Sequence, residues 1–326
     1  MKRLLARLGL GLSLLLAGCG SQQEHIVDAA AGRRAPDVAI DRDSWGLFPA
    51  GALVWGQVDI QALSRAEFGP AILERAQRGV PLSRGAGIDW AKDVETAHFA
   101  VYASARGDVA TVLKGRFDAQ KLRDAITADP VTSSGEPISI SKFAGAEVIH
   151  AGAWSLSILT SRTIAVGTEI GVRRILERVE EGRVARALPH WFEKMLQTAG
   201  GRAHLGVDLD AQPVPATIRS ELDFLAGIRG ARLIGNFESP GLNIAGTLSY
   251  DTKERAEHAR SRIDSNVTSL ERATWLLTIL KVPRPIRRFE SSVAGQTVQF
   301  ATELEGRAVA MGVGYLGELE GKIGLE

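Results

Sequence analysis

The chain has 326 residues, of which 45% are hydrophobic and 24% charged, the composition of a globular protein with room for one large or two ordinary domains. The formal net charge of +1 at pH 7 gives no electrostatic case for binding nucleic acid or an acidic substrate. A single cysteine excludes an internal disulfide and a thiolate-based metal site.

The first 18 residues have the order of a secretory signal peptide. Lys2, Arg3 and Arg7 precede an apolar run from Leu8 to Leu16, and that run is too short to cross a bilayer. We therefore expect residues 1–18 to be removed on export. The mature chain would then lose three positive charges and carry a net charge near −2 (+1 − 3).

The leader closes on Leu16-Ala17-Gly18-Cys19, which holds the only cysteine. This motif resembles the lipobox of bacterial lipoproteins, in which the cysteine thiol carries a diacylglyceryl group and the leader is cut just before it. The resemblance implies that Cys19 is the lipidated first residue of the mature chain. In that family Gly rather than Asp after the cysteine usually directs the protein to the outer membrane, so Gly20 favours the outer over the inner membrane.

Residues 19–44 are polar and interrupted by glycine and proline, which predicts a lipidated N-terminus followed by a flexible tether. A first folded unit is expected over residues 45–201. Its pattern predicts, in order, a strand at 52–60, a helix within 61–77, a hairpin at 96–117, a helix capped by Asp118, short strands between 138 and 167, and helices that start at Thr168 and Pro189.

A second unit is expected over residues 202–326, because the pattern repeats. It predicts a strand at 203–210, a short helix at 216–226, a hairpin at 231–250, a helix capped by Asp251, and strands at 286–292, 297–304 and 308–313. In the alignment we propose, Phe117-Asp118 corresponds to Tyr250-Asp251. The main departure is an extra amphipathic segment at 266–281.

Strands grouped in hairpins with helices between the groups predict an α+β fold, made of two similar units of antiparallel sheet with helices packed on one face. Gly87-Ile88-Asp89-Trp90 and Val166-Gly167-Thr168 are similar to segments of a class of uncharacterised, duplicated α+β domains in exported bacterial proteins. That resemblance implies a fold and supplies no activity or site residues.

The sequence contains no constellation that indicates catalysis. Gly312 to Gly317 fits G-x-G-x-x-G, but nine residues follow it, too few for a dinucleotide-binding domain. Asp208 and Asp210 are spaced to share one side of a strand and fit a turn better than a calcium site. The six histidines form no metal-binding pair, and we expect His98 and His204, in different units, not to meet. We therefore predict no catalytic, cofactor-binding or metal-binding residues.

These observations predict a lipid-anchored cell-envelope lipoprotein that acts as a non-enzymatic binding or scaffolding module. Its partners would be the membrane, through the lipid on Cys19, and an envelope protein or apolar ligand, but not nucleic acid. Two alternatives stay open: a carrier that holds an apolar ligand in a cavity between sheet and helices, and a hydrolase with dispersed site residues.

Cys19→Ser tests the anchor. The variant should leave the membrane fraction, because covalent acyl chains supply about 0.8 kcal/mol for each buried methylene and nothing else in the sequence replaces them. Fractionation with a high-salt wash measures this. Retention of a correctly cleaved Cys19→Ser chain on the membrane would contradict the anchor, and an uncleaved leader is recognised by its mass.

Overall fold

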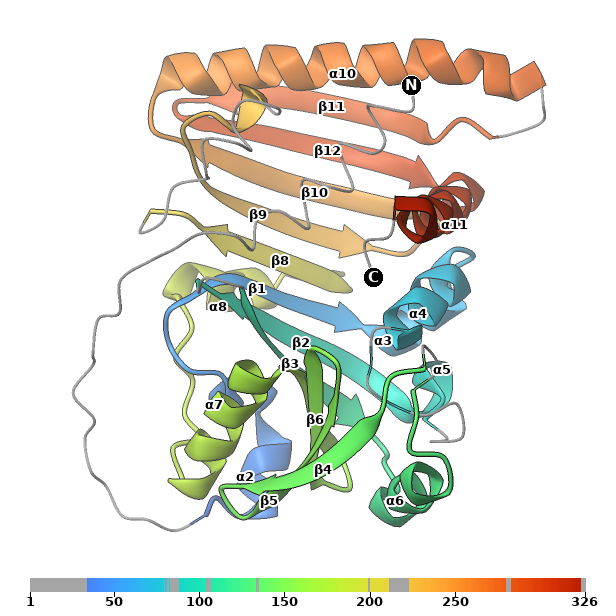
Figure 1. The fold of residues 1–326 in the computed structure, drawn as a ribbon. Coiled ribbons are helices and arrows are strands. Elements are labelled where there is room, and N and C mark those ends of the chain that lie inside the picture. Colours follow the sequence, from blue (N-terminus) through green and yellow to red (C-terminus); the bar gives the residue numbers. More distant parts are fainter. Residues whose placement is uncertain are drawn as a thin grey trace.

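In the described part of the chain, twelve strands form one antiparallel sheet (Figure 1). The computed structural model describes residues 34–78, 80, 82, 88–103, 107–132, 135–198, 200–210, 223–279 and 283–323, without the side chains of 78, 223, 273, 275–279 and 315–323. The leader, Cys19 and the short helix expected at 216–226 lie mainly or wholly outside these ranges. The strands are β1 (Ala52–Asp59), β2 (Val94–Tyr102), β3 (Asp108–Gly115), β4 (Ile138–Phe143), β5 (Ala146–Ala151), β6 (Trp154–Thr160), β7 (Thr163–Thr168), β8 (Ala203–Asp208), β9 (Ile228–Asn236), β10 (Gly241–Tyr250), β11 (Ile286–Ala294) and β12 (Thr297–Glu305).

Helices pack on this sheet, so the α+β class expected from the sequence is confirmed. The helices are α2 (Asp37–Arg42), η2 (Ser44–Leu47), α3 (Ile60–Arg65), α4 (Gly69–Arg78), α5 (Trp90–Asp93), α6 (Ala119–Ala128), α7 (Glu169–Glu180), α8 (His190–Leu196), η4 (Asp223–Leu225), α10 (Lys253–Ile279) and α11 (Gly306–Ile323).

The strand order is β11-β12-β10-β9-β8-β1-β2-β3-β7-β6-β5-β4. Read outward from the centre, β8-β9-β10-β12-β11 repeats the order β1-β2-β3-β7-β6, and β5 and β4 extend only the first half. This is the arrangement that a duplication requires. The two halves share one continuous sheet, because β1 pairs directly with β8.

The β1·β8 pairing is itself symmetric. If Val58-Asp59 of β1 is aligned with Val207-Asp208 of β8, Gly56 is aligned with Leu205. Gly56 and Leu205 are also partners in the β1·β8 register, so the two strands pair about a local twofold axis at this position. Both aspartates then turn the chain at the end of their strand. The Asp59 carboxylate accepts a hydrogen bond from the Ala62 amide at 2.8 Å, and Asp208 accepts one from Asp210 at 3.1 Å.

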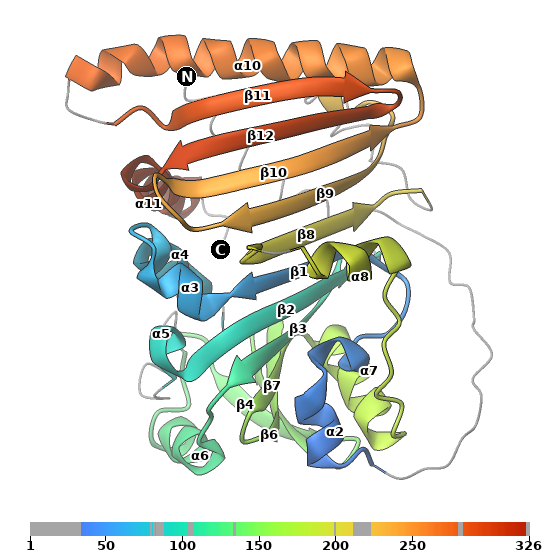
Figure 2. The ribbon, with the colours of Figure 1, turned by 180° about the vertical axis from the view of Figure 1, so that it is seen from behind.

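Helices cover both faces of the first half of the sheet, because successive residues of a strand point to opposite sides. Val112 and Ala165 lie in a core with α2, η2, α7 and α8, on what we call the α7 face (Figure 2). Leu113 and Ile164 lie in a second core with α3, α4, α5 and α6, on the α4 face. The expectation of helices on one face therefore does not hold for the first half. In the second half α10 and α11 lie on the α4 face, but α8 packs on the other face of β8.

The folded body begins before the expected boundary at residue 45. Ala35 and Ile40 are 2% and 0% exposed, and the Ala35 amide donates a hydrogen bond to the Val179 carbonyl at 2.7 Å. Residues 34–44, assigned to the tether, are thus part of the body. The sequence pattern missed them because α2 has only six residues and a single buried side chain.

A polar cluster fixes α2 to the sheet. The hydroxyls of Thr160 and Thr163 each donate to one Asp41 carboxylate oxygen at 2.6 Å, and the Lys114 ammonium donates to the Asp41 carbonyl at 2.6 Å. Burial raises the pKa of Asp41, but the two threonine hydrogen bonds and the charge of Lys114 outweigh it and hold that pKa below its usual value. Asp41 is therefore charged at neutral pH, and its hydrogen-bonding capacity is used within the fold.

The C-terminal segment is a helix where the sequence predicted a strand at 308–313. The side chain of Glu305, the last residue of β12, accepts a hydrogen bond from the Ala308 amide at 2.8 Å and starts α11. Val309 and Ala310 then pack against the core that contains α4. The G-x-G-x-x-G stretch lies within α11, so its glycines form no phosphate-binding loop. Alternating small and apolar residues suggested a strand, but contacts with α4 favour the helix.

The helix caps test the alignment of the two halves. Asp118 caps α6 as expected, because its carboxylate accepts from the amides of Gln120 and Lys121 at 3.0 Å each. In α10 the cap is Thr252, whose hydroxyl accepts from the Arg255 amide at 3.2 Å, while Asp251 lies one residue earlier and pairs with Arg255 at 2.7 Å. The assignment of Asp251 as the cap is therefore wrong by one position.

We expect Asp118→Ala and Thr252→Ala each to lower the free energy of unfolding by about 1 kcal/mol, the usual cost of a lost N-cap. Asp251→Ala should cost about 0.5 kcal/mol, because it removes a partly exposed ion pair. Urea unfolding of the three variants gives their free energies of unfolding and so the order of the losses. A larger loss for Asp251→Ala than for Thr252→Ala would contradict the capping assignment.

Candidate functional site

The α4 face of the second half carries an apolar surface that its helices cover only in part. The residues concerned point to the same side of β8, β9, β10 and β12, and each is partly exposed. We call this surface the open strip and define it by Leu205, Val207, Leu233, Ile244, Leu248 and Phe300. On the same face of the first half, Leu113, Leu156 and Ile164 are at most 2% exposed. The contrast identifies the open strip as surface left without a packed helix of the described chain.

Gly246 brings the side chains of the strip together. It lies between Leu233 and Phe300 in the register, and a Cβ there would lie 2.5 Å from the Leu233 side chain and 3.0 Å from the Phe300 ring. The two side chains therefore meet above the glycine. Phe289 continues the layer onto β11, with its ring stacked 6.5 Å from that of Phe300.

Two helices frame the open strip (Figure 1). Ala256 and Ala259 of α10 are buried against Tyr250 and Val298 at one end of the strands. Val309 of α11 packs near Leu242 at the other end. Among the helices described, none crosses the middle of β8, β9 and β10 in Figure 1. The opposite face of β10 and β12 is mostly polar or charged, for example at Thr247, Gln299 and Glu303, whereas that of β8 lies under α8 at Gly206. On β10 and β12 the apolar surface is therefore confined to one side of the sheet.

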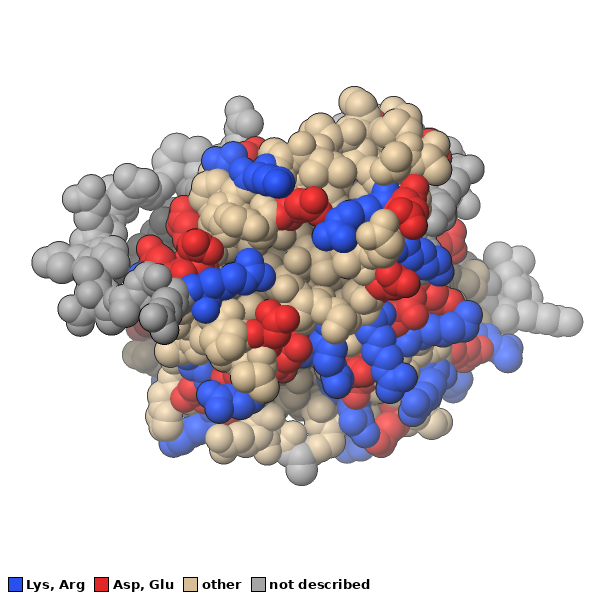
Figure 3. Space-filling model, turned by 90° about the horizontal axis from the view of Figure 1, so that it is seen from below, with Lys and Arg blue, Asp and Glu red and all other residues tan. Residues whose placement is uncertain are grey.

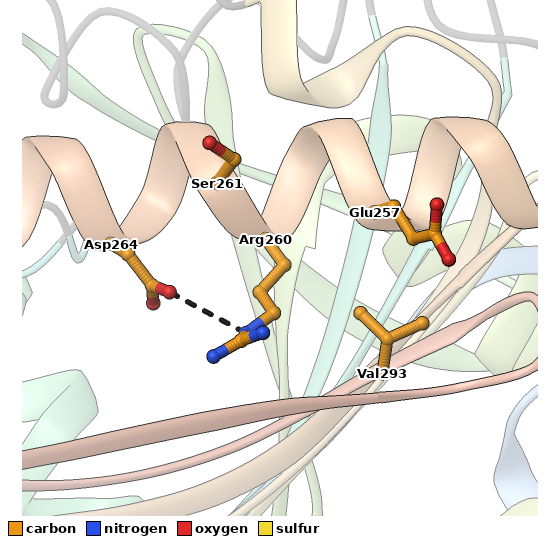
Figure 4. A pocket seen from close by; sticks show the side chains of 5 residues that line it. All are labelled: Glu257, Arg260, Ser261, Asp264 and Val293. Carbon is orange, nitrogen blue, oxygen red and sulfur yellow. Dashed lines mark ion pairs between the residues drawn. The ribbon is translucent and has the colours of Figure 1, made fainter.

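A pocket of about 430 Å³ lies between α10 and β11 (Figure 4). Its lining is Glu257, Arg260, Ser261, Asp264 and Val293. Its polar groups bind one another. Arg260 pairs with Asp264 at 3.4 Å and donates to the Ser291 hydroxyl at 3.1 Å, and Ser291 donates to Asp264 at 2.6 Å. This network holds α10 against the edge strand β11. Its charged and polar groups have partners in one another, so they do not require a ligand.

His98 and His204 lie in one cross-strand row, which the sequence analysis did not expect. Both pair in register with Gln57 of β1, one from each side. Two strand spacings place their Cα atoms about 9–10 Å apart. Both are buried, and no hydrogen-bond partner is found for the Nδ1 atom of His98 or for either ring nitrogen of His204. Among the described residues no group of three or more His, Cys, Asp or Glu side chains could hold a metal ion.

His150 has the most polar surroundings of the histidines considered for catalysis. Its Nε2 lies 2.7 Å from the Ser141 hydroxyl and its Nδ1 lies 2.9 Å from the Ser155 hydroxyl. The hydrogen bonds found for this ring go to hydroxyls and none to a carboxylate, so the third member of a Ser–His–carboxylate triad has no counterpart among the described residues. The arrangement is a polar ladder across β4, β5 and β6.

The other residues singled out in the sequence have structural roles. Asp208 closes the turn after β8, and Asp210 pairs with Arg229 at 3.0 Å. Neither carboxylate is held for a metal. No helix among the described residues is long and apolar enough to span a bilayer. The alternation of residues along the strands predicts which side chains of the open strip share a face. It does not predict which face the described helices leave uncovered.

The sequence matches no family of known proteins and no curated protein. In fold, the chain is similar to the solved structure of crystal form I of TP0453, with a TM-score of 0.52 and 12% sequence identity. That match covers 84% of this chain and 97% of the other. Crystal forms III and IV of TP0453 give TM-scores of 0.48 and 0.46, also at 12% identity, over 82% of this chain and 97% and 95% of theirs. At this identity the likeness to crystal form I establishes the fold alone.

His98 should make stability depend on pH. Burial is the main cause that lowers its pKa to about 4, whereas an unfolded histidine titrates near 6.5. The unfolded chain therefore binds this proton more tightly, and the folded state loses stability as the pH falls from 6.5 towards 4. We expect His98 to account for a decrease of about 3 kcal/mol in the free energy of unfolding between pH 7 and pH 4.

His98→Leu should remove this dependence. Urea unfolding of both proteins across that pH range gives the difference in stability at each pH, in which the titration of other groups cancels. The difference should shift in favour of the leucine variant at acid pH. A difference that stays constant would contradict the burial of a neutral imidazole.

Proposed function

We propose that this protein is a lipoprotein of the cell envelope, anchored through a lipid on Cys19 in the outer membrane rather than the inner membrane. In this proposal it is a non-enzymatic binding module that holds an apolar ligand or the apolar surface of an envelope partner on the open strip. The observation that carries the binding role is the contrast between the two halves of the α4 face. Leu113, Leu156 and Ile164 are buried on this face of the first half, whereas the side chains of the open strip are partly exposed on the same face of the second half.

The physical argument is the free energy of apolar surface in water. Burial of apolar area stabilises a contact by roughly 25 cal/mol per Å², so an apolar strip of six residues on four strands favours association with acyl chains or apolar side chains. Contiguous exposed apolar patches on folded proteins usually mark a site of interaction. The opposite face of β10 and β12 is polar, so an apolar ligand or partner is expected to bind these strands on the side of the open strip only.

The carrier alternative has less support. It requires an enclosed apolar cavity, but the pocket of about 430 Å³ beside α10 is lined by four polar or charged side chains and one valine. The open strip would hold a ligand against a surface instead. The hydrolase alternative requires a base, a nucleophile and an orienting acid, and the serine–histidine ladder at His150 supplies the first two only.

Neighbouring residues of β12 give a matched test of the binding surface. Phe300 belongs to the open strip, and Ala301 points to the opposite face and is exposed. We expect Phe300→Asp to weaken binding of a fluorescent fatty acid at least about tenfold, because a charge placed in an apolar contact costs more than about 1.4 kcal/mol. Ala301→Asp should leave the affinity unchanged.

Titration of the chain that begins at Gly20 with the probe measures both variants, and thermal unfolding verifies that they are folded. Leu233→Gln serves as a second strip variant should Phe300→Asp be unstable. Equal affinities for the strip variants and Ala301→Asp, all folded, would show that the probe binds elsewhere.

A further inference from the structure

A second pocket, of about 310 Å³, lies where the chain enters the folded body. Arg34 lines it and is the first residue of the described chain. Arg123 of α6 and Lys142 and Glu147 of β4 and β5 form other walls. Ile149, only 5% exposed, and Ile158 provide apolar parts of the lining. This pocket belongs to the first half and is distinct from the open strip.

The pocket has an excess of positive charge. Arg123 and Glu147 neutralise each other at 2.7 Å. Within the described chain, no ion pair is found for Lys142 or for Arg34, whose guanidinium donates one long hydrogen bond of 3.5 Å to the Leu159 carbonyl. Two cations thus remain beside an apolar lining, with the Glu180 carboxylate close to Gly145 of that lining, and the pocket keeps a net positive charge. A phosphate or phosphodiester group matches that charge, because arginine and lysine donate several charge-assisted hydrogen bonds to its oxygens.

Exposed apolar side chains lie close in the chain to two cations of the pocket. Ile140 is 50% exposed and lies on the same face of the edge strand β4 as Lys142, two residues away. Val38 of α2, four residues after Arg34, is 76% exposed. Cations beside exposed aliphatic groups are the combination that proteins present to the headgroup region of a bilayer, where both kinds of group find partners.

The position of the pocket in the chain favours a membrane source for the phosphate. Fourteen residues, 20–33, separate Cys19 from Arg34. A chain of that length spans at most about 50 Å even when fully extended. A lipid on Cys19 would therefore keep the pocket within about 50 Å of the bilayer surface. Contact with a headgroup becomes effectively intramolecular, so a weak affinity for each headgroup is sufficient.

We propose that the pocket formed by Arg34, Arg123 and Lys142 binds the phosphate of an anionic phospholipid and so sets the orientation of the anchored body on its membrane. The proposal rests on the lipid anchor of the proposed function. Figure 3 looks onto the end of the molecule that carries α2, β5 and α6 and shows positive side chains interspersed with negative ones. The contact is therefore local to the pocket and does not arise from a uniformly basic face.

The single cysteine of the chain makes an orientation measurement possible. In the lipidated protein the Cys19 thiol is blocked, so Ile140→Cys introduces the one thiol that an environment-sensitive fluorophore can label. The labelled, acylated full-length chain is reconstituted into vesicles of phosphatidylcholine alone or with phosphatidylglycerol. Quenching by lipids that carry a headgroup quencher reports contact between residue 140 and the bilayer.

We expect quenching in vesicles that contain phosphatidylglycerol and its loss in phosphatidylcholine alone. The double variant Arg34→Gln, Lys142→Gln should lower the signal to the phosphatidylcholine level. Lys194→Gln, Lys253→Gln removes the same charge from exposed positions on α8 and α10 and should retain the signal. Thermal unfolding verifies that both double variants are folded.

Three outcomes would overturn the proposal: quenching that is independent of lipid charge, equal loss in both double variants, or full displacement by millimolar inorganic phosphate at constant ionic strength. The last would identify a free anion as the ligand. Flotation of the same samples tests the anchor separately. Release from the vesicles reports failure of the lipid anchor, whereas bound protein without quenching reports failure of the headgroup site alone.

Discussion

The pairing of β1 with β8 is the interaction on which the rest of the structure depends, because it joins two half-sheets into one. Each strand contributes a glycine to opposite faces of the junction. A Cβ at Gly56 would lie 2.0 Å from the Phe99 ring, and one at Gly206 would lie 2.6 Å from Trp191 and 2.7 Å from Phe192. Large aromatic side chains therefore lie directly on the backbone at the centre of the sheet. A side chain at Gly56 would displace the Phe99 ring on the α4 face, and one at Gly206 would displace the α8 aromatic side chains on the α7 face.

The two halves repeat the strand order but differ in their helices, and that difference creates the open strip. The helix after β3 has ten residues and buries Leu122 and Ile126 in the core of the first half. The helix after β10 has 27 residues. Of its described side chains, Ala256 and Ala259 near its start are 0% and 1% exposed, and Thr274 near its end is 6% exposed. A long helix held at the strand ends and along β11 covers less of the sheet than several short helices do. The apolar residues of β9 and β10 are left partly exposed as a result.

Local patterns predicted most of the elements and little of their arrangement. Alternating strands, hairpin turns and the Asp118 cap depend on neighbouring residues and are visible in the sequence. The order of the strands depends on pairings between residues more than 100 positions apart, such as Gln57 with His204, for which one sequence contains no signal. For the same reason the cross-strand row of His98 and His204 was missed, and α11 was taken for a strand because its contact with α4 is distant in the chain. No helix of the described residues packs over the open strip, and a pattern of apolar residues cannot show this.

The positions of the two proposed sites in the sheet bear on how the protein could work. The pocket at Arg34 adjoins β4 and β5, while the open strip is centred on β9 and β10, at the other side of the β1·β8 junction. From β5 to β10 there are eight strand spacings, which at about 4.8 Å each amount to about 38 Å along the sheet. A body anchored and oriented through the Arg34 end would hold the open strip away from the lipid surface. At that distance from the headgroups, the apolar side chains of the open strip would not insert into the membrane that holds the anchor. The strip would then be accessible to a ligand or partner from the aqueous side.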